Sequence, residues 1–197
     1  MRKFLVAAGF VGLLALFAAV PVGFAQHPPR DTCHTVGGGT ICNFSHVEAY
    51  GPLDTGIVCG SGADAFDIFD QGVDSETQTF WFDENDNLTK FTDHDVYSFG
   101  QWSNPATGAI VPYTQHNLET VVFPVPGDFT SGTSTITGEN IYRVGTGKFV
   151  LQAVGRQVFN WDGSELLSSH GPNAFVAAFY EGDPHTFDQI CAALGAS

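Results

Sequence analysis

The feature that most constrains the fold is a repeated alternation of aromatic- and threonine-rich runs with short turns between residues 59 and 169. The runs at 77–83 and 88–99 flank Asp-Glu-Asn-Asp-Asn, and those at 149–161 and 165–169 flank Asp-Gly-Ser. Such turn-bounded runs are typical of antiparallel hairpins. The region shows no sustained helical periodicity. The pattern predicts an all-β domain, a sandwich or barrel, and we favour an antiparallel barrel of about eight strands.

Further strands and one helix complete the expected order of elements. A turn at 103–108 precedes a strand at 109–123, which the following prolines end because proline cannot donate to a strand ladder. Residues 129–144 are expected to form two strands around Gly138. Only residues 184–194 have helical periodicity, which predicts a short C-terminal helix.

The run 149–159 has apolar residues at both odd and even positions. A strand of this kind is buried on both faces, as in a barrel wall with a filled interior and a covered exterior. The preceding Gly-Thr-Gly at 145–147 predicts a tight bend, because glycine adopts positive φ without strain. The outer covering could be a subunit interface, so a homo-oligomer is one expectation.

Residues 1–25 have the pattern of a signal peptide. Arg2 and Lys3 precede an apolar stretch at 4–20, and Gly23 and Ala25 place small residues at a cleavage site. An uncleaved membrane anchor is the alternative, because about 17 apolar residues barely span a bilayer. We expect a soluble, secreted, extracellular protein that begins near residue 26 and does not associate with membranes once the signal is removed.

The cysteines are expected to form two disulfides. Four cysteines in an exported chain favour pairing because that compartment is oxidising. We predict Cys33–Cys42 around a glycine-rich loop and Cys59–Cys191 tying the C-terminus to the body. A zinc site is the alternative, but the spacings contain no closely spaced ligand pair. We therefore expect no metal and no cofactor.

Composition excludes some partners. Seven Lys and Arg oppose 21 Asp and Glu, which gives a net charge of −14. Nucleic acids and anionic membranes are bound through cationic side chains, so neither is an expected partner. The chain is expected to form one domain, in which residues 26–58 are a loop-rich segment carrying a disulfide and residues 59–197 form the barrel and helix.

Several short patterns are better explained by structure than by function. Asp83-x-Asn85-x-Asn87 imitates an EF-hand loop but lacks its glycine and glutamate, so we interpret it as a solvated hairpin turn. In Asp93-His94-Asp95, the histidine points away from its neighbours on a strand, so the three cannot share one metal. We interpret this segment as a surface strand. His116 and Glu119 also fall on opposite faces.

The residues 145–155 carry a family resemblance. Gly-Thr-Gly-Lys-Phe followed by Ala153-x-Gly155 resembles a motif of the allene oxide cyclase and dirigent superfamily. The layout of residues 75–170 also resembles uncharacterised exported proteins of actinobacteria. The superfamily resemblance implies an eight-stranded antiparallel barrel with an apolar interior pocket. It identifies no catalytic residue here, because the acidic and tyrosine positions of characterised members have no secure match.

Three residues are candidates for a ligand pocket. Tyr142 lies beside the glycine turn, and Arg156 is a rare cation in an apolar strand, where it could anchor an anionic or hydroxylated ligand. The alternative is that Arg156, like Arg143, pairs with a carboxylate on the outer wall. Glu119 shares a strand face with Val121 and so could be a buried acid, although a position at the barrel end is the competing account.

No catalytic constellation is recognisable in the sequence, so enzymatic activity stays undecided. The leading hypothesis is an exported β-barrel that binds a small apolar or amphipathic ligand or has a structural role. One alternative, implied by the resemblance, is an isomerase or cyclase that controls substrate conformation. The other is an oligomeric interaction module. An empty lined interior would favour the first two, and a filled interior would favour the third.

Overall fold

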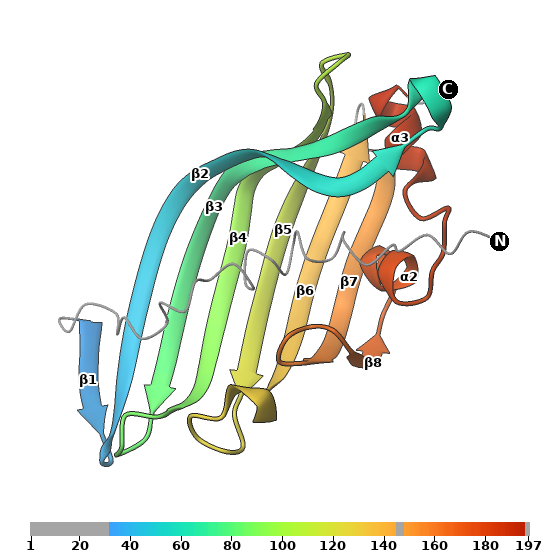
Figure 1. Ribbon diagram of the computed structural model, residues 1–197. Coiled ribbons are helices and arrows are strands. Elements are labelled where there is room, and N and C mark those ends of the chain that lie inside the picture. Colours follow the sequence, from blue (N-terminus) through green and yellow to red (C-terminus); the bar gives the residue numbers. More distant parts are fainter. Residues whose placement is uncertain (1–31, 145–147, 196–197) are drawn as a thin grey trace.

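The computed structural model describes residues 32–144 and 148–195 (Figure 1). One eight-stranded antiparallel sheet dominates it, with the strands paired in chain order. The strands are β1 (Cys33–Val36), β2 (Gly39–Cys59), β3 (Phe66–Phe82), β4 (Leu88–Asn104), β5 (Ala109–Val122), β6 (Thr133–Val144), β7 (Lys148–Asn160) and β8 (Leu166–His170). Two short helices follow, α2 (Ala174–Phe179) and α3 (Asp188–Leu194), and 3-10 turns lie at Gly62–Asp64 and Phe129–Ser131. The all-β prediction is confirmed.

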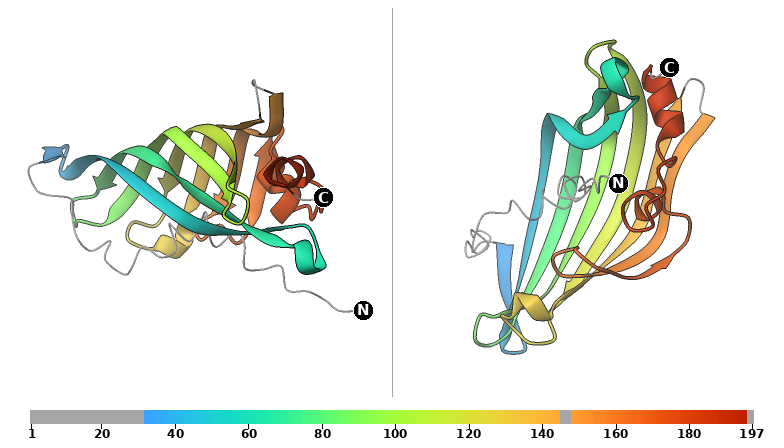
Figure 2. Two further views of the ribbon diagram at one scale, coloured as in Figure 1. Left: turned by 90° about the horizontal axis from the view of Figure 1, so that it is seen from above. Right: turned by 45° about the vertical axis from the view of Figure 1, so that its right-hand side comes forward.

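The sheet curves and twists but does not close, since β1 and β8 form its two edges. Figure 2 shows the strands wrapping around a concave face, with α2 and α3 beside the β7 side. The expected eight-stranded architecture is therefore an open half-barrel. No helix in the described ranges is long and apolar enough to cross a membrane.

The hairpin of β2 and β3 arches over one end of the sheet to reach α3 (Figure 1). Register shifts between Tyr50 and Leu53 and between Asp54 and Val58 interrupt the pairing, and such bulges bend strands. The disulfide Cys59–Cys191 joins the far end of β2 to α3, and Cys33–Cys42 joins β1 to β2. Both predicted pairings are confirmed, and no described cysteine is free.

Several boundaries differ from the sequence expectation. The segment 26–58 was expected to be rich in loops, but its described part from residue 33 onward lies almost entirely in β1 and the long β2. Gly138 was expected to be a turn between two strands but lies inside the single strand β6, paired to Asn117 and Gly155. The expected helix at 184–194 is shorter, and α2 was not predicted because six residues carry almost no periodic signal.

The strand β7 is buried on one face rather than two. Its residues Leu151, Ala153 and Gln157 are buried, whereas Gln152 and Arg156 between them are exposed. The expectation of a covered outer wall is therefore wrong for this part of the strand. The bend expected at 145–147 and the signal pattern at 1–25 lie outside the described residues.

Candidate functional site

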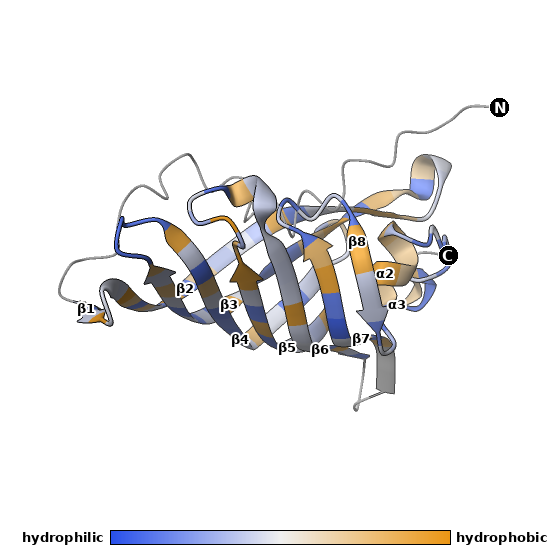
Figure 3. Cartoon of the chain, turned by 90° about the horizontal axis from the view of Figure 1, so that it is seen from below, coloured by the Kyte–Doolittle hydropathy of each residue, from blue (hydrophilic) through white to orange (hydrophobic). Residues whose placement is uncertain are grey.

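A cavity of about 360 Å³ opens on the concave face. Side chains from β2 to β7 and from α2 line it. Alternate residues of a strand point to the same face, so much of the lining comes from every second residue. Leu53, Asp54 and Thr55 line it consecutively, where β2 is irregular. Figure 3 shows the result along the strands, where hydrophilic and hydrophobic residues are interleaved.

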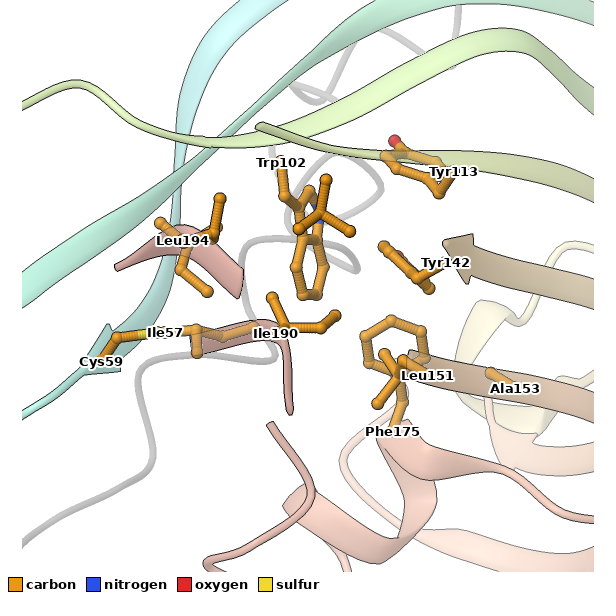
Figure 4. Close-up of a cluster of buried hydrophobic side chains, with 12 residues drawn as sticks. Ile57, Cys59, Trp102, Tyr113, Tyr142, Leu151, Ala153, Phe175, Ile190 and Leu194 are labelled. Atoms are coloured by element: carbon orange, nitrogen blue, oxygen red, sulfur yellow. The ribbon is translucent and has the colours of Figure 1, made fainter. Parts of the chain in front are cut away.

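Two apolar clusters bound the cavity. The helix-side cluster joins the sheet to the helices and comprises Ile57, Cys59, Ile68, Trp102, Val111, Tyr113, Tyr142, Leu151, Ala153, Phe175, Ile190 and Leu194. Figure 4 shows these side chains converging from strands and helices. The turn-side cluster at the other end comprises Cys42, Phe80, Phe91, Val121 and Phe123. Burial of these side chains is the main source of stability in both regions.

The rings of Tyr113, Tyr142 and Phe175 belong to the helix-side cluster and form one wall of the cavity, which we call the aromatic wall. The centroid of Tyr142 lies 4.6 Å from that of Trp102 and 4.8 Å from that of Tyr113. The Tyr113 ring rests on Gly100, where an added Cβ would lie 2.4 Å from the ring. The glycine at position 100 therefore makes room for this wall.

Between the two clusters runs a belt of acidic side chains, which we call the acidic belt. It comprises Asp74 and Glu76 from β3, Asp93 and Asp95 from β4, and Glu119 from β5. Four of them are at most 8% exposed, and Glu76 is half-buried. The register places Glu76 opposite Asp95 and Asp93 opposite Glu119. Like charges directly opposite one another destabilise a sheet, so this arrangement is costly for folding.

Burial raises the pKa values throughout the acidic belt. The pKa of Glu76 is raised to about 8 and that of Asp95 to about 9, first by burial and then by the neighbouring carboxylates. Burial also raises the pKa values of Asp74 and Asp93. The pKa of Glu119 is raised to about 7, against the opposing effect of a hydrogen bond donated by Ser134. Glu76, Asp95 and Glu119 can therefore hold protons near neutral pH, and a positive charge bound among them would displace those protons and favour the ionised forms.

Few donors satisfy the acidic belt. Gln78 Nε2 donates to Asp93 Oδ2 at 2.9 Å and to Glu76 Oε2 at 3.1 Å, and His46 Nε2 lies 3.5 Å from Glu76 Oε2. One buried oxygen of each of Asp74, Asp93 and Asp95 has no hydrogen-bond partner. Buried polar atoms are nearly always paired in proteins, so these oxygens indicate a site that accepts an external group.

A second acidic group lies next to the aromatic wall. Tyr113 Oη donates to both carboxylate oxygens of Asp70 at 3.1 Å, and Tyr50 Oη is 2.6 Å from Tyr113 Oη. Burial raises the pKa of Asp70 to about 7, although these hydrogen bonds act to lower it. The pKa of Tyr113 is raised mainly by burial and then by the charge of Asp70. A carboxyl group titrating near pH 7 beside phenols can exchange protons with a bound molecule.

The structure brings together two of the three predicted pocket residues. Glu119 and Tyr142 are both buried and line the cavity. Arg156 is exposed on the opposite face of β7 and does not line it, so it cannot anchor a ligand there. Glu119 is also not at a strand end, because its partners Asp93 and Ile136 lie within β4 and β6.

Of the acidic belt, the sequence indicated Glu119 alone. Asp93 and Asp95 are buried, so the interpretation of 93–95 as a surface strand is wrong. His94 does point away from them as expected, and its Nε2 lies 2.6 Å from His116 Nε2 on the outer face. The signal was in β3, where positions 70, 74, 76 and 78 are polar while positions 68 and 80, on the same face, are apolar.

Comparison with known proteins adds no assignment. No family model matches the chain, and neither the curated proteins nor the solved structures contain a match. The resemblance to the allene oxide cyclase and dirigent superfamily therefore stays a prediction.

Proposed function

We propose that this protein is exported and binds a small amphipathic molecule in the concave cavity. The observation that carries the proposal is the lined volume of about 360 Å³, with an apolar cluster at each end and buried polar groups between them. Sites for small molecules are typically concave, of about 300–1,000 Å³, and mostly apolar with a few convergent polar groups. This cavity has each of those properties.

The apolar part of the ligand is expected to contact the aromatic wall. Tyr142, Phe175 and Phe159 line the cavity, as does the small side chain of Ala153, and the Phe175 centroid lies 6.2 Å from that of Tyr142. Aromatic side chains provide large contact areas at low cost in conformational entropy. An aliphatic or aromatic body would therefore be held mainly by this wall.

The polar part of the ligand is expected to face the acidic belt. No Lys or Arg of the described residues lines the cavity, whereas seven Asp and Glu side chains do. A carboxylate head group would meet like charge, while an amine would meet opposite charge and unpaired oxygens. We therefore propose that the ligand carries an amine or a hydroxyl group rather than an anion.

Export is part of the proposal. The signal-peptide pattern at 1–25 and the two disulfides support it, because disulfides persist in oxidising compartments. Mass spectrometry of the N-terminus of the secreted protein tests it, and the expected first residue lies near position 26.

The ligand proposal is tested by isothermal titration with three eight-carbon probes, octylamine, octanol and octanoate, in the presence of EDTA. We expect affinity to fall in that order, with octylamine binding at least about tenfold more tightly than octanoate, which corresponds to about 1.4 kcal/mol. Mass spectrometry of molecules that co-purify with the native protein identifies the natural ligand. Absence of binding for all three probes together with no co-purifying molecule would contradict the proposal.

A matched pair of variants locates the binding. Ile136→Trp places a large ring in the cavity, and Thr137→Trp places the same ring on the opposite face of β6. We expect Ile136→Trp to weaken octylamine binding at least about tenfold and Thr137→Trp to change it less than about twofold. Equal effects of the two variants would place the binding elsewhere.

An isomerase or cyclase is a second candidate function. It is supported by Asp70, whose carboxyl group is bonded to Tyr113 beside an apolar wall. Such a site can hold one conformer of a reactive substrate and move a proton. The test supplies the co-purified ligand to fresh protein and follows it by chromatography for a product of unchanged mass. Loss of that product with Asp70→Asn, with ligand affinity retained, would support catalysis.

Self-association is the remaining candidate. Large apolar side chains are exposed on the described surface, among them Val47, Phe99 and Ile110. An apolar outer surface can serve as an interface between copies of the chain. Analytical ultracentrifugation across a range of concentrations tests it, and a single monomeric species at all of them would exclude it.

A further inference from the structure

Three carboxylates in the cavity converge on one point. Asp74, Glu76 and Asp95 each offer one oxygen, and these three oxygens all lie within 4.8 Å of one another. They come from paired positions on β3 and β4, where Glu76 is the direct partner of Asp95. Strand pairing fixes their spacing, so the arrangement does not depend on a flexible loop.

The converging carboxylates are buried and incompletely bonded. Asp74 is 4% exposed and Asp95 is 8% exposed, and one oxygen of each has no hydrogen-bond partner. Asp93, fully buried beside them, also has one unpartnered oxygen. A buried carboxylate oxygen without a donor loses its hydration and gains nothing in return. An external positive group would remove this deficit.

No Lys or Arg among the described residues lines the cavity to supply that group. The only basic side chain of the described residues that lines the cavity is that of His46. Its Nε2 forms an ion-pair contact with Glu76 but with neither aspartate. Lys90 instead lies over the ring of Trp81, 4.5 Å from its centroid. The electrostatic field inside the cavity is therefore set by carboxylates.

We propose that Asp74, Glu76 and Asp95 bind a divalent, oxygen-preferring cation of the calcium class in the wall of the cavity. Oxygens within 4.8 Å of one another fit a coordination sphere of about 2.4 Å radius, the usual value for calcium. The amide side chains of Gln115 and Asn117 also line the cavity and can add neutral oxygens. Zinc is disfavoured because it prefers nitrogen and sulfur, and magnesium because it retains a shell of waters.

This inference departs from the sequence expectation that the chain holds no metal. That expectation considered cysteine spacing, the turn at 83–87 and the segment 93–95, in which His94 points away from its neighbours. The proposed site instead combines alternate residues of two strands, which no local pattern reveals. It does not depend on the proposed organic ligand.

The test measures calcium binding by the purified, disulfide-bonded protein at pH 7.5 without organic ligand. Isothermal titration gives the Kd, and thermal unfolding in EDTA is compared with unfolding in CaCl₂ at about ten times that Kd. Binding to the folded state alone at this concentration raises Tm by about 3–6 °C. We expect that shift for the wild-type protein and a smaller one with MgCl₂.

Substitution of single aspartates by asparagine tests which side chains bind the calcium ion. Asp95→Asn keeps the shape of the side chain and removes its charge, so the fold is retained while the calcium Kd rises at least about tenfold. Asp74→Asn is expected to act in the same way. Asp67→Asn is the matched control, because Asp67 is an exposed residue of β3, and its calcium Kd is expected to change less than about twofold.

Three outcomes would overturn the proposal. They are no calcium binding at 10 mM, an equal or larger Tm shift with magnesium or zinc, and retention of binding in both Asp95→Asn and Asp74→Asn. The octyl-probe titrations are performed in EDTA, so their failure would concern the organic ligand alone. If the wild-type protein bound octylamine but no calcium, the metal-site proposal alone would be contradicted.

Discussion

Neighbouring residues of β3 and β4 point alternately to the concave and the outer face, and the two faces carry different chemistry. Asp74, Asp93 and Asp95 on the concave face are at most 8% exposed. On the outer face, Thr77 accepts a hydrogen bond from Ser45 Oγ at 3.3 Å, and Thr79 Oγ1 donates to Asn43 Oδ1 at 2.9 Å. At these positions carboxylates gather on the concave face, whereas neutral hydrogen-bonded pairs lie on the outer face.

This distribution is the reverse of what favours stability, since isolated buried carboxylates are costly and surface carboxylates are not. The outer face has the neutral cross-strand pairs that stabilise a sheet. The concave face instead has like charges in register and oxygens without donors. Residues that oppose folding in this way are expected at functional sites. The contrast between the faces therefore supports the proposal that the concave face binds the ligand.

The largest expected contrast between the faces is in apolar packing. Trp102 is buried at the centre of the helix-side cluster, whereas Ile110 on β5 is 52% exposed. Trp102→Ala is expected to lower the free energy of unfolding by about 3–5 kcal/mol, and Ile110→Ala by less than about 0.5 kcal/mol. Urea denaturation measures both. Similar losses for the two variants would mean that the outer face is also covered.

The second contrast concerns pH. The pKa of Glu119 is raised to about 7 in the folded state, so its proton is bound more tightly there than in the unfolded chain. The stability that the protonated Glu119 contributes is therefore fully present below about pH 4.5 and is lost as the pH rises toward 7. We expect it to contribute a loss of about 2–4 kcal/mol over that window, measured by urea denaturation at several pH values.

Glu119→Gln is expected to flatten this pH dependence, because the amide does not titrate. Glu139→Gln is the control, since Glu139 is exposed on β6 and no buried carboxyl is lost. An unchanged pH profile in Glu119→Gln would show that Glu119 titrates normally and that the acidic belt is hydrated.

A third contrast compares hydroxyl groups on the two faces. Tyr113→Phe removes the donor to Asp70, and Thr79→Val removes the donor to Asn43. The first is expected to cost about 1–3 kcal/mol, because it removes both contacts at 3.1 Å and leaves Asp70 the longer bond from Tyr50 Oη at 3.4 Å. The second is expected to cost less than about 0.5 kcal/mol, because water replaces the lost bond. Thermal unfolding compares them, and equal costs would argue against a dry environment for Asp70.

The smallest effect is expected at Val47, which is 69% exposed on β2. Val47→Lys should change the free energy of unfolding by less than about 0.5 kcal/mol and leave octylamine binding unchanged. Sedimentation of the variant and the wild type at the same concentration distinguishes the two uses of the outer face. A shift from dimer to monomer would show that Val47 lies in an interface between copies.

The sequence predicted those parts of the fold that depend on local chemistry. The turn at 83–87 was recognisable because Asp83 Oδ1 accepts from the backbone N–H groups of Asn85 and Asn87, an interaction that these residue types favour. The disulfides followed from cysteine number and spacing. In contrast, β2 was missed because Gly51 and Pro52 and two bulges interrupt its alternation.

The candidate site was only partly predictable because it depends on register. Glu119 could be identified, since an acidic residue within an apolar run is a local signal. Asp74, Glu76 and Asp95 form a group only when β3 and β4 pair as observed, with a register shift between Trp81 and Phe82 near the turn. A shift of one residue would place the acidic side chains on opposite faces, and composition alone cannot decide between the two.

The bond between Cys59 and Cys191 spans 132 positions of the chain, so β3 to β8 lie within one covalent ring. If the protein were stretched from points on either side of this ring, tension would pass through the sulfur atoms and bypass the enclosed strands. The ring would withhold about 450 Å of extensible chain until the bond is reduced. In a force spectrometer, the sheet should therefore resist extension under oxidising conditions and become a long, compliant tether after treatment with a reductant.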